Sequence, residues 1–346
     1  MANLLRTGEL ASEIKEYIIG LNSGLAADGK ESALAIIRVG ENPSDIAYER
    51  SIEKYAESVS MNLQLIRVDE DIDEEEFLEL LDETNEDEDI DGVLVFRPLP
   101  QHLDDDIPRD RLNPLKDVDG ITAVSEAGVY DIGLGPEEAE GIEDIEEIGE
   151  IIPSWLDMGF PPCTAEACML ILRKYGIDPA GKTAVVIGRS NVIGKPVALM
   201  LMHKDATVTI CHSKTQNLEE ICRNADILVV ATGKAESIGR EYVSPGQTVL
   251  DVGIHVKEDG TMCGDVKFDE VEPVVANITP VPGGVGGLTT ALLVKHAVDA
   301  SMRFFIIENE DMLGDEYVVG QPLEESGMEI RGKVIKFDRS GDDDKE

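Results

Sequence analysis

The chain contains the stretch Val185-Val186-Ile187-Gly188-Arg189-Ser190-Asn191-Val192-Ile193-Gly194-Lys195-Pro196. A buried-strand pattern over 183–187 ends at the first glycine, and a helix-compatible run over 197–203 follows the turn. Such a unit directs backbone N–H groups and a helix N-terminus at one point, which suits a phosphate. The spacing G-x-S-x-x-x-G differs from the common G-x-G-x-x-G, so this stretch alone leaves nucleotide binding and a plain turn open.

The next predicted strand, residues 207–211, favours one kind of nucleotide. In dinucleotide folds this strand often ends in a carboxylate that binds the ribose 2′-OH of NAD. Here it ends in His212-Ser213-Lys214-Thr215, without a carboxylate. A hydroxyl and a cation at this place, with Arg189 in the glycine turn, suit a 2′-phosphate and predict NADP before NAD. The alternative is a solvated polar turn.

Composition limits the class of protein. The 346 residues, 42% of them apolar, suffice for two globular domains with a large core. No N-terminal signal peptide and no membrane-spanning run is recognisable. The cysteines form no C-x-x-C pair, which favours a reducing cytoplasm, and the histidines are too scattered for a metal site.

The charge is strongly negative. Lys and Arg number 30 against 71 Asp and Glu, a formal net charge of −41. Such a field repels nucleic acid and anionic membranes, so neither is expected as a partner. A solvated acidic surface is the simplest interpretation, and adaptation to high salt is a sharper hypothesis.

Strand and helix patterns alternate along the chain. This alternation predicts βαβ units with parallel sheets, an α/β fold. A helix over 289–305 is placed to return to the first domain. The expected strands are 32–40, 62–68, 92–96, 183–187, 207–211, 226–230 and 248–253, and the expected helices include 44–58, 74–81 and 164–175.

Further motifs identify a family. They are Val39-Gly40-Glu41-Asn42-Pro43-Ser44 with Tyr48, Asp91 to Val95 with Pro98-Leu99-Pro100, Lys116-Asp117-Val118-Asp119-Gly120, and Pro280-Val281-Pro282-Gly283-Gly284-Val285-Gly286. With the glycine turn, they make residues 1–305 resemble the methylenetetrahydrofolate dehydrogenase/methenyltetrahydrofolate cyclohydrolase family of the FolD type. Members oxidise 5,10-methylenetetrahydrofolate with NADP, and most also hydrolyse the product to 10-formyltetrahydrofolate.

The resemblance implies a domain plan. Residues 1–155 would form the folate-binding catalytic domain, with 290–310 packing back on it, and 156–289 a Rossmann-like NADP domain. Residues 311–346 would be an acidic C-terminal appendage. Residues 133–155 are an acidic insertion absent from compact members, either a surface ornament or a border of the site. A homodimer is typical of the family.

The resemblance also implies site residues. Asp119 would hold the amide–guanidine edge of the pterin, and Tyr48 would pack on its ring; these two are the expected catalytic residues. Pro282 and Gly283 would form the wall between folate and nicotinamide. The expected substrate-binding residues are Tyr48, Phe96, Asp119, Pro282 and Gly283, and the expected cofactor-binding residues are Gly188, Arg189, Ser190, Ser213 and Ile254, with no metal ligand.

Departures from the family affect the second reaction. Bifunctional members carry a lysine one helical turn after the tyrosine, where this chain has Ile52, and the glutamine that pairs with this lysine is replaced by Phe96. Lys54 should point away from Tyr48, and the guanidinium of Arg97 is a poor base. We therefore expect a dehydrogenase with weak or lost cyclohydrolase activity. The alternatives are a bifunctional enzyme with another proton relay and a non-catalytic pterin- or NADP-binding protein.

Overall fold

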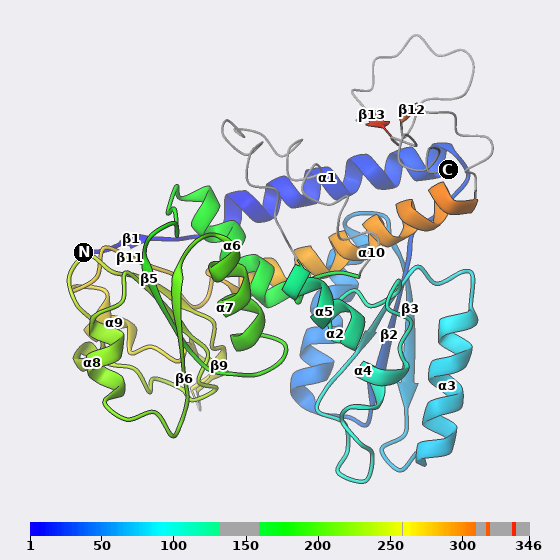
Figure 1. Ribbon diagram of the computed structural model, residues 1–346. Helices are drawn as coiled ribbons and strands as arrows, with labels where there is room; N and C mark the ends of the chain where they lie inside the picture. The colour runs from blue at the N-terminus through cyan, green and yellow to red at the C-terminus, as the bar shows by residue number, and fades with distance from the viewer. Residues whose placement is uncertain (132–158, 258, 309–315, 319–333, 337–346) are drawn as a thin grey trace, which may run out of the picture.

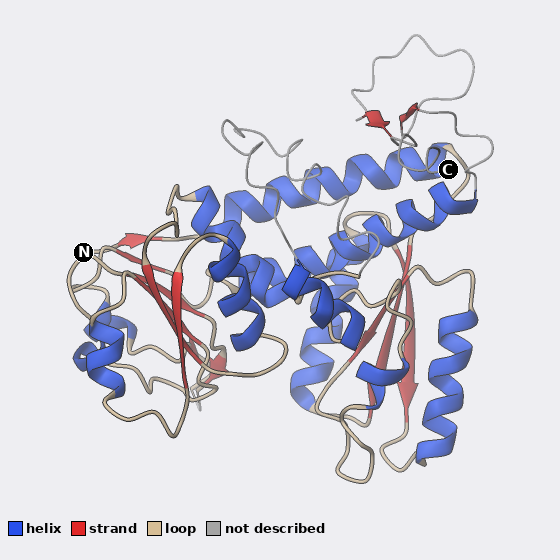
Figure 2. Cartoon of the chain, in the orientation of Figure 1, coloured by secondary structure: helices blue, strands red, loops and turns tan. Residues whose placement is uncertain are grey.

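The computed structural model describes residues 1–131, 159–257, 259–308, 316–318 and 334–336. It contains two α/β bodies side by side, with long helices running along one side of both (Figure 1). The sheets and the helices that cover them are distinguished by colour in Figure 2. The acidic insertion at 133–155, and all of the tail except the short paired strands β12 (Glu316–Val318) and β13 (Val334–Lys336), lie outside the described residues.

The first sheet has three parallel strands in the order β3-β2-β4. Its strands are β2 (Ala33–Val39), β3 (Asn62–Val68) and β4 (Gly92–Val95), and its helices are α2 (Pro43–Glu57), α3 (Glu74–Glu86), α4 (Ile107–Arg111) and α5 (Ala123–Asp131). Helices α2 and α3 pack on opposite faces, so the central strand reads as a continuous apolar run. Helix α2 begins where the Asn42 side chain accepts a hydrogen bond from the Ser44 N–H, with Pro43 at the first position.

The second sheet has six parallel strands in the order β1-β11-β8-β7-β5-β6. Its strands are β1 (Asn3–Leu4), β5 (Thr183–Ile187), β6 (Thr207–Cys211), β7 (Ile227–Val230), β8 (Thr248–Asp251) and β11 (Asn277–Ile278), and its helices are α7 (Gly194–His203), α8 (Leu218–Arg223) and α9 (Phe268–Val271). From β5 the chain builds outward to β6 and then returns to β7 on the other side. The carboxyl ends of β5 and β7 therefore flank the switch point, where doubly wound sheets bind ligands.

Three helices connect the two bodies. They are α1 (Gly8–Ala27), α6 (Cys163–Lys174) and α10 (Gly286–Glu308). Helix α10 contacts α1, α6, α2 and strands of the first sheet. One apolar cluster includes Ile52 from α2, Val186 from β5 and Leu292 from α10, so the two bodies share a continuous core.

The predicted α/β fold and the returning helix are confirmed, and strands 62–68, 183–187 and 207–211 have the predicted bounds. The helix expected over 74–81 extends to Glu86, and the placement of the N-terminal residues also differs. Residues 3–4, expected with the first domain, pair with β11 and extend the second sheet. A strand of two residues is too short to show a hydrophobic periodicity, so no local pattern reveals it. The domain boundaries themselves stay a prediction.

Candidate functional site

Tyr48 and Phe96, both expected at the substrate site, are in contact. Tyr48 lies on α2, and Phe96 directly follows β4. Their ring centroids are 5.6 Å apart with an interplanar angle of 26°. Phe96 is buried and Tyr48 is half-buried. The pair therefore forms an aromatic wall in which Tyr48 is the side chain that is partly exposed.

Asp119 lies in a loop that runs beside β4. The neighbouring Asp117 organises this loop, because its carboxylate accepts hydrogen bonds from the N–H groups of Ile121 and Thr122 at 3.0 and 2.7 Å. Burial and the charge of Asp117 raise the pKa of Asp119 to about 6, while the charge of Arg97 lowers it. Asp119 is therefore mainly an ionised acceptor at neutral pH.

The first turn of α10 lies between the expected substrate residue Tyr48 and the expected cofactor residue Ile254. Thr290 and Thr289 lie next to Tyr48 and lower its pKa, but burial raises this pKa above its ordinary value, so the phenol stays protonated. At the start of the helix, a Cβ on Gly286 would collide with the side chain of Ile254. Four residues of helix span about 6 Å along the axis. Tyr48 and Ile254 thus contact the same helical turn.

The turn after β5 fits a phosphate. Gly188 has φ +141°, and a Cβ there would lie 2.5 Å from the Ala231 carbonyl oxygen at the end of β7. A Cβ on Gly194 would collide with the Gly188 backbone. The Ser190 hydroxyl accepts hydrogen bonds from the N–H groups of Ile193 and Gly194 at 3.2 and 3.4 Å. Glycines thus allow a tight, side-chain-free turn at the start of α7, as a dinucleotide phosphate requires.

The residues predicted to bind a 2′-phosphate follow the carboxyl ends of two neighbouring strands. Ile187 pairs with Cys211 in parallel register, so the turns that carry Arg189 and Ser213 follow neighbouring strand ends. Arg189, Ser213 and Lys214 are all exposed. Their placement is compatible with the predicted contact to the ribose phosphate.

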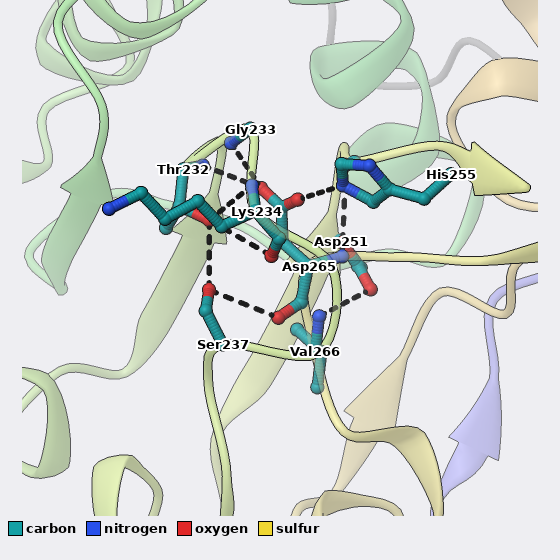
Figure 3. A network of polar contacts seen from close by, with 9 residues as sticks. Thr232, Gly233, Lys234, Ser237, Asp251, His255, Asp265 and Val266 are labelled. Carbon is teal, nitrogen blue, oxygen red and sulfur yellow. Dashed lines mark hydrogen bonds and ion pairs between the residues drawn. The ribbon is translucent and has the colours of Figure 1, made fainter. Parts of the chain in front are cut away.

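The loops that follow β7 and β8 are joined by a carboxylate network that the sequence analysis missed (Figure 3). Asp265 accepts hydrogen bonds from the N–H groups of Thr232 and Gly233 at 2.5 and 2.9 Å, and its other oxygen lies 2.7 Å from His255 Nε2. Asp251 accepts a hydrogen bond from the Asp265 N–H at 3.0 Å, and burial raises the pKa of Asp251 to about 7. The network fixes both loops beside the switch point.

Pro282 and Gly283 lie in the loop that precedes α10, and both are exposed. Gly283 has φ +96°, a conformation that favours glycine. Thr7 anchors the loop: its N–H donates to the Gly283 carbonyl at 3.1 Å and its hydroxyl to the Gly284 carbonyl at 2.9 Å. The loop therefore has a fixed, exposed surface next to the α10 turn.

Ile52 and Phe96, which stand where bifunctional members of the family have a lysine and a glutamine, both lie in the apolar core. Ile52, one turn after Tyr48, is fully buried in the shared core. Lys54 is exposed. Arg97 is partly exposed, and its charge reaches Asp119. Helix α2 thus presents a hydrocarbon beside Tyr48 where the resemblance implied an amine.

Other residues around Asp119 and Tyr48 were not expected from the sequence. They are Thr289, Thr290, His296 and Cys163, which opens α6, together with Glu166, which contacts His296. These residues are far apart in sequence and meet only because α6 and α10 pack together. In the described part of the chain, no group of three or more His, Cys, Asp or Glu side chains is arranged to hold a metal ion. None of the described helices is long and apolar enough to cross a bilayer.

Comparison with known proteins agrees with this arrangement. Residues 5–119 match the catalytic-domain model of tetrahydrofolate dehydrogenase/cyclohydrolase, and residues 162–305 match its NAD(P)-binding-domain model. The bifunctional protein FolD of Carboxydothermus hydrogenoformans is 44% identical over 302 residues, covering 87% of this chain and 97% of that protein.

Two solved structures are similar over the same region. The bifunctional FolD dehydrogenase/cyclohydrolase of Campylobacter jejuni has a TM-score of 0.78 and 36% identity, covering 87% of this chain and 99% of the other. The Trypanosoma brucei FolD, solved with NADP and an inhibitor, has a TM-score of 0.76 and 29% identity, covering 88% and 98%. This chain belongs to the tetrahydrofolate dehydrogenase/cyclohydrolase family.

Proposed function

We propose that this chain oxidises 5,10-methylenetetrahydrofolate to 5,10-methenyltetrahydrofolate with NADP as hydride acceptor. The observation that carries the proposal is the first turn of α10, which contacts Tyr48 through Thr290 and Ile254 through Gly286. A folate held at Tyr48 would lie beside a nicotinamide flanked by Ile254.

The side chains have distinct roles in this proposal. Asp119 accepts two N–H donors of the pterin edge, and Tyr48 with Phe96 packs against the ring. Bound NADP supplies the nicotinamide that accepts the hydride. Electrons come from the folate nitrogen, so alignment of the reacting carbons matters more than a protein base. This suits a Tyr48 that stays protonated.

The second reaction has two candidate outcomes. The names of the similar proteins in Carboxydothermus and Campylobacter favour the bifunctional alternative over the weak or lost cyclohydrolase expected from the sequence. One observation of this chain favours a dehydrogenase bias: Ile52 is fully buried and Phe96 is stacked on Tyr48, at the positions where the resemblance implied a lysine and a glutamine. If this chain hydrolyses the methenyl product, another group must move the protons.

One assay separates these possibilities. Purified chain is mixed with methylenetetrahydrofolate and NADP, and absorbance of NADPH and of methenyltetrahydrofolate is followed in the same cuvette. NADPH formation excludes a non-catalytic binding protein. Methenyl product that disappears well above its spontaneous rate indicates a bifunctional enzyme, and product that accumulates indicates a dehydrogenase bias.

Arg189→Ala is expected to raise the KM for NADP about 10- to 100-fold, since a charge-assisted contact to phosphate is lost. The KM for NAD, which lacks the 2′-phosphate, should change by less than about threefold on the same grounds. Lys267→Ala, at an exposed cation on the same domain, serves as the control. Equal losses for NADP and NAD would refute the role given to Arg189.

We also propose a homodimer in a reducing cytoplasm. Strand β6 is a sheet edge with Thr209 and Ile210 exposed, and such an edge can pair with a second copy. All five cysteines are buried and free, which suits reducing conditions. Light scattering should give twice the 37.6 kDa of one chain, and Ile210→Lys should shift the mass toward the monomer. A monomeric parent protein would contradict the dimer.

A further inference from the structure

His296, on α10, makes two short polar contacts inside the protein. Its Nδ1 lies 2.8 Å from the Val118 carbonyl oxygen, and its Nε2 lies 2.8 Å from Glu166 Oε2. A carbonyl and an ionised carboxylate can only accept hydrogen bonds, so a ring that serves both must donate from both nitrogens. This geometry requires a protonated, positively charged imidazolium, provided that Glu166 is ionised.

The surroundings favour an ionised Glu166. Burial raises the pKa of Glu166, but the charge and hydrogen bond of His296 and the charge of Lys295 outweigh burial and lower it. The ring of His296 is 2% exposed and stacks on Phe160, with centroids 4.6 Å apart and planes at 13°. A stack and two hydrogen bonds therefore fix the orientation of a buried charge that is paired.

The contact between His296 and the Val118 carbonyl oxygen lies directly beside Asp119, whose carboxylate is proposed to bind the pterin. The Val118 carbonyl belongs to the peptide bond that leads to Asp119, and it also lies 3.4 Å from Cys163 Sγ. Burial raises the pKa of Cys163, so this side chain remains a thiol. At Gly120, with φ +66°, a Cβ would lie 2.5 Å from the backbone of Pro161, so the loop is pressed against the segment that opens α6.

We propose that His296 is a positioning residue whose imidazolium fixes the Val118–Asp119 peptide and so holds the Asp119 carboxylate in place for the pterin. The proposal rests on the proposed function, since it assigns Asp119 to the folate. The charged and titratable groups that face Asp119 are Asp117, Arg97, Tyr48, Cys163 and His296, and those that face His296 are Glu166, Lys295, Cys163 and Asp119.

These neighbours determine the direction in which the pKa of Asp119, and with it the KM for folate, should change. Burial first and Asp117 second raise the pKa of Asp119 to about 6, while Arg97 and His296 lower it. Without the imidazolium, this pKa rises further, and more of Asp119 is protonated near neutral pH. Because the pterin edge needs the ionised form, the KM for folate should rise as pH falls through the pKa of Asp119, and earlier in a variant without the charge.

The test compares His296→Gln and Glu166→Gln with the parent enzyme. At about pH 7, His296→Gln should raise the KM for methylenetetrahydrofolate at least about threefold, with smaller effects on kcat and on the KM for NADP. The difference should shrink toward about pH 9, where Asp119 is ionised in both proteins. Glu166→Gln should act in the same direction. His203→Gln, which removes a histidine contact to the Val129 carbonyl on α5, is the control and should leave all three parameters unchanged.

A second measurement does not depend on the variants or on the reaction. Nitrogen NMR of histidine-labelled parent protein should show both ring nitrogens of His296 protonated at about pH 7. A neutral ring, which would mean a protonated Glu166, overturns the proposal, and so does a pH-independent rise in KM for both substrates in His296→Gln. If the parent enzyme forms no NADPH at all, the proposed function fails instead, and the NMR result still decides the state of His296.

Discussion

Asp119→Asn is expected to lower kcat/KM for methylenetetrahydrofolate about 10²- to 10³-fold. The amide offers one acceptor and one donor to a pterin edge that presents two donors, so a charge-assisted hydrogen bond is lost and an N–H faces another N–H. Sites built to pair a polar group penalise such mismatches strongly. Steady-state kinetics at saturating NADP measures the effect, which should fall mainly on KM.

The control for this variant is Asp110→Asn. Asp110 is an exposed carboxylate of the same domain, paired with Arg109. Its replacement should leave kcat/KM within about twofold, as is usual for surface ion pairs. An Asp119→Asn enzyme that binds folate as well as the parent would remove Asp119 from the site.

Ile52→Lys combined with Phe96→Gln is expected to raise methenyltetrahydrofolate hydrolysis about 10²-fold or more, since positioned acid–base groups typically contribute 10²- to 10⁴-fold. The two changes recreate the lysine and glutamine that the resemblance assigns to bifunctional members. The dehydrogenase should change much less, because hydride transfer needs alignment rather than a base. Loss of methenyl absorbance in the absence of NADP measures the hydrolysis.

The single variants serve as controls for this pair. Ile52→Lys alone places an amine at a fully buried position, and it should lower the melting temperature more than the double variant does. Lys54→Ala, at an exposed position of the same helix, should change neither activity. A double variant that hydrolyses no faster than the parent would mean that hydrolysis does not depend on this pair.

Much of the fold could be predicted because its strands are long apolar runs between turn residues. Strands β3, β5 and β6 have the predicted bounds. Helix α1 was not assigned, although Leu10, Ile14 and Ile18 repeat at the helical spacing and are buried. Strands β1 and β11 have two residues each and are defined by pairing across the whole chain, which no local pattern reveals.

The site was predictable only in part, because it too is formed by parts of the chain that are distant in sequence. Motifs named Tyr48 and Asp119, and the structure places Tyr48 near Thr290 and Cys163, and Asp119 near Cys163 and His296. The partners Cys163 on α6 and His296 on α10 lie 45 and 178 residues further along the chain than Val118, which they both contact. Their approach depends on helix packing, and packing has no signature in a single sequence.

The most direct test of the account is the rate of NADPH formation by the purified parent protein supplied with methylenetetrahydrofolate and NADP. We expect catalytic turnover that saturates in both substrates and is clearly faster with NADP than with NAD. Absence of NADPH formation by a folded protein that still binds NADP would contradict it.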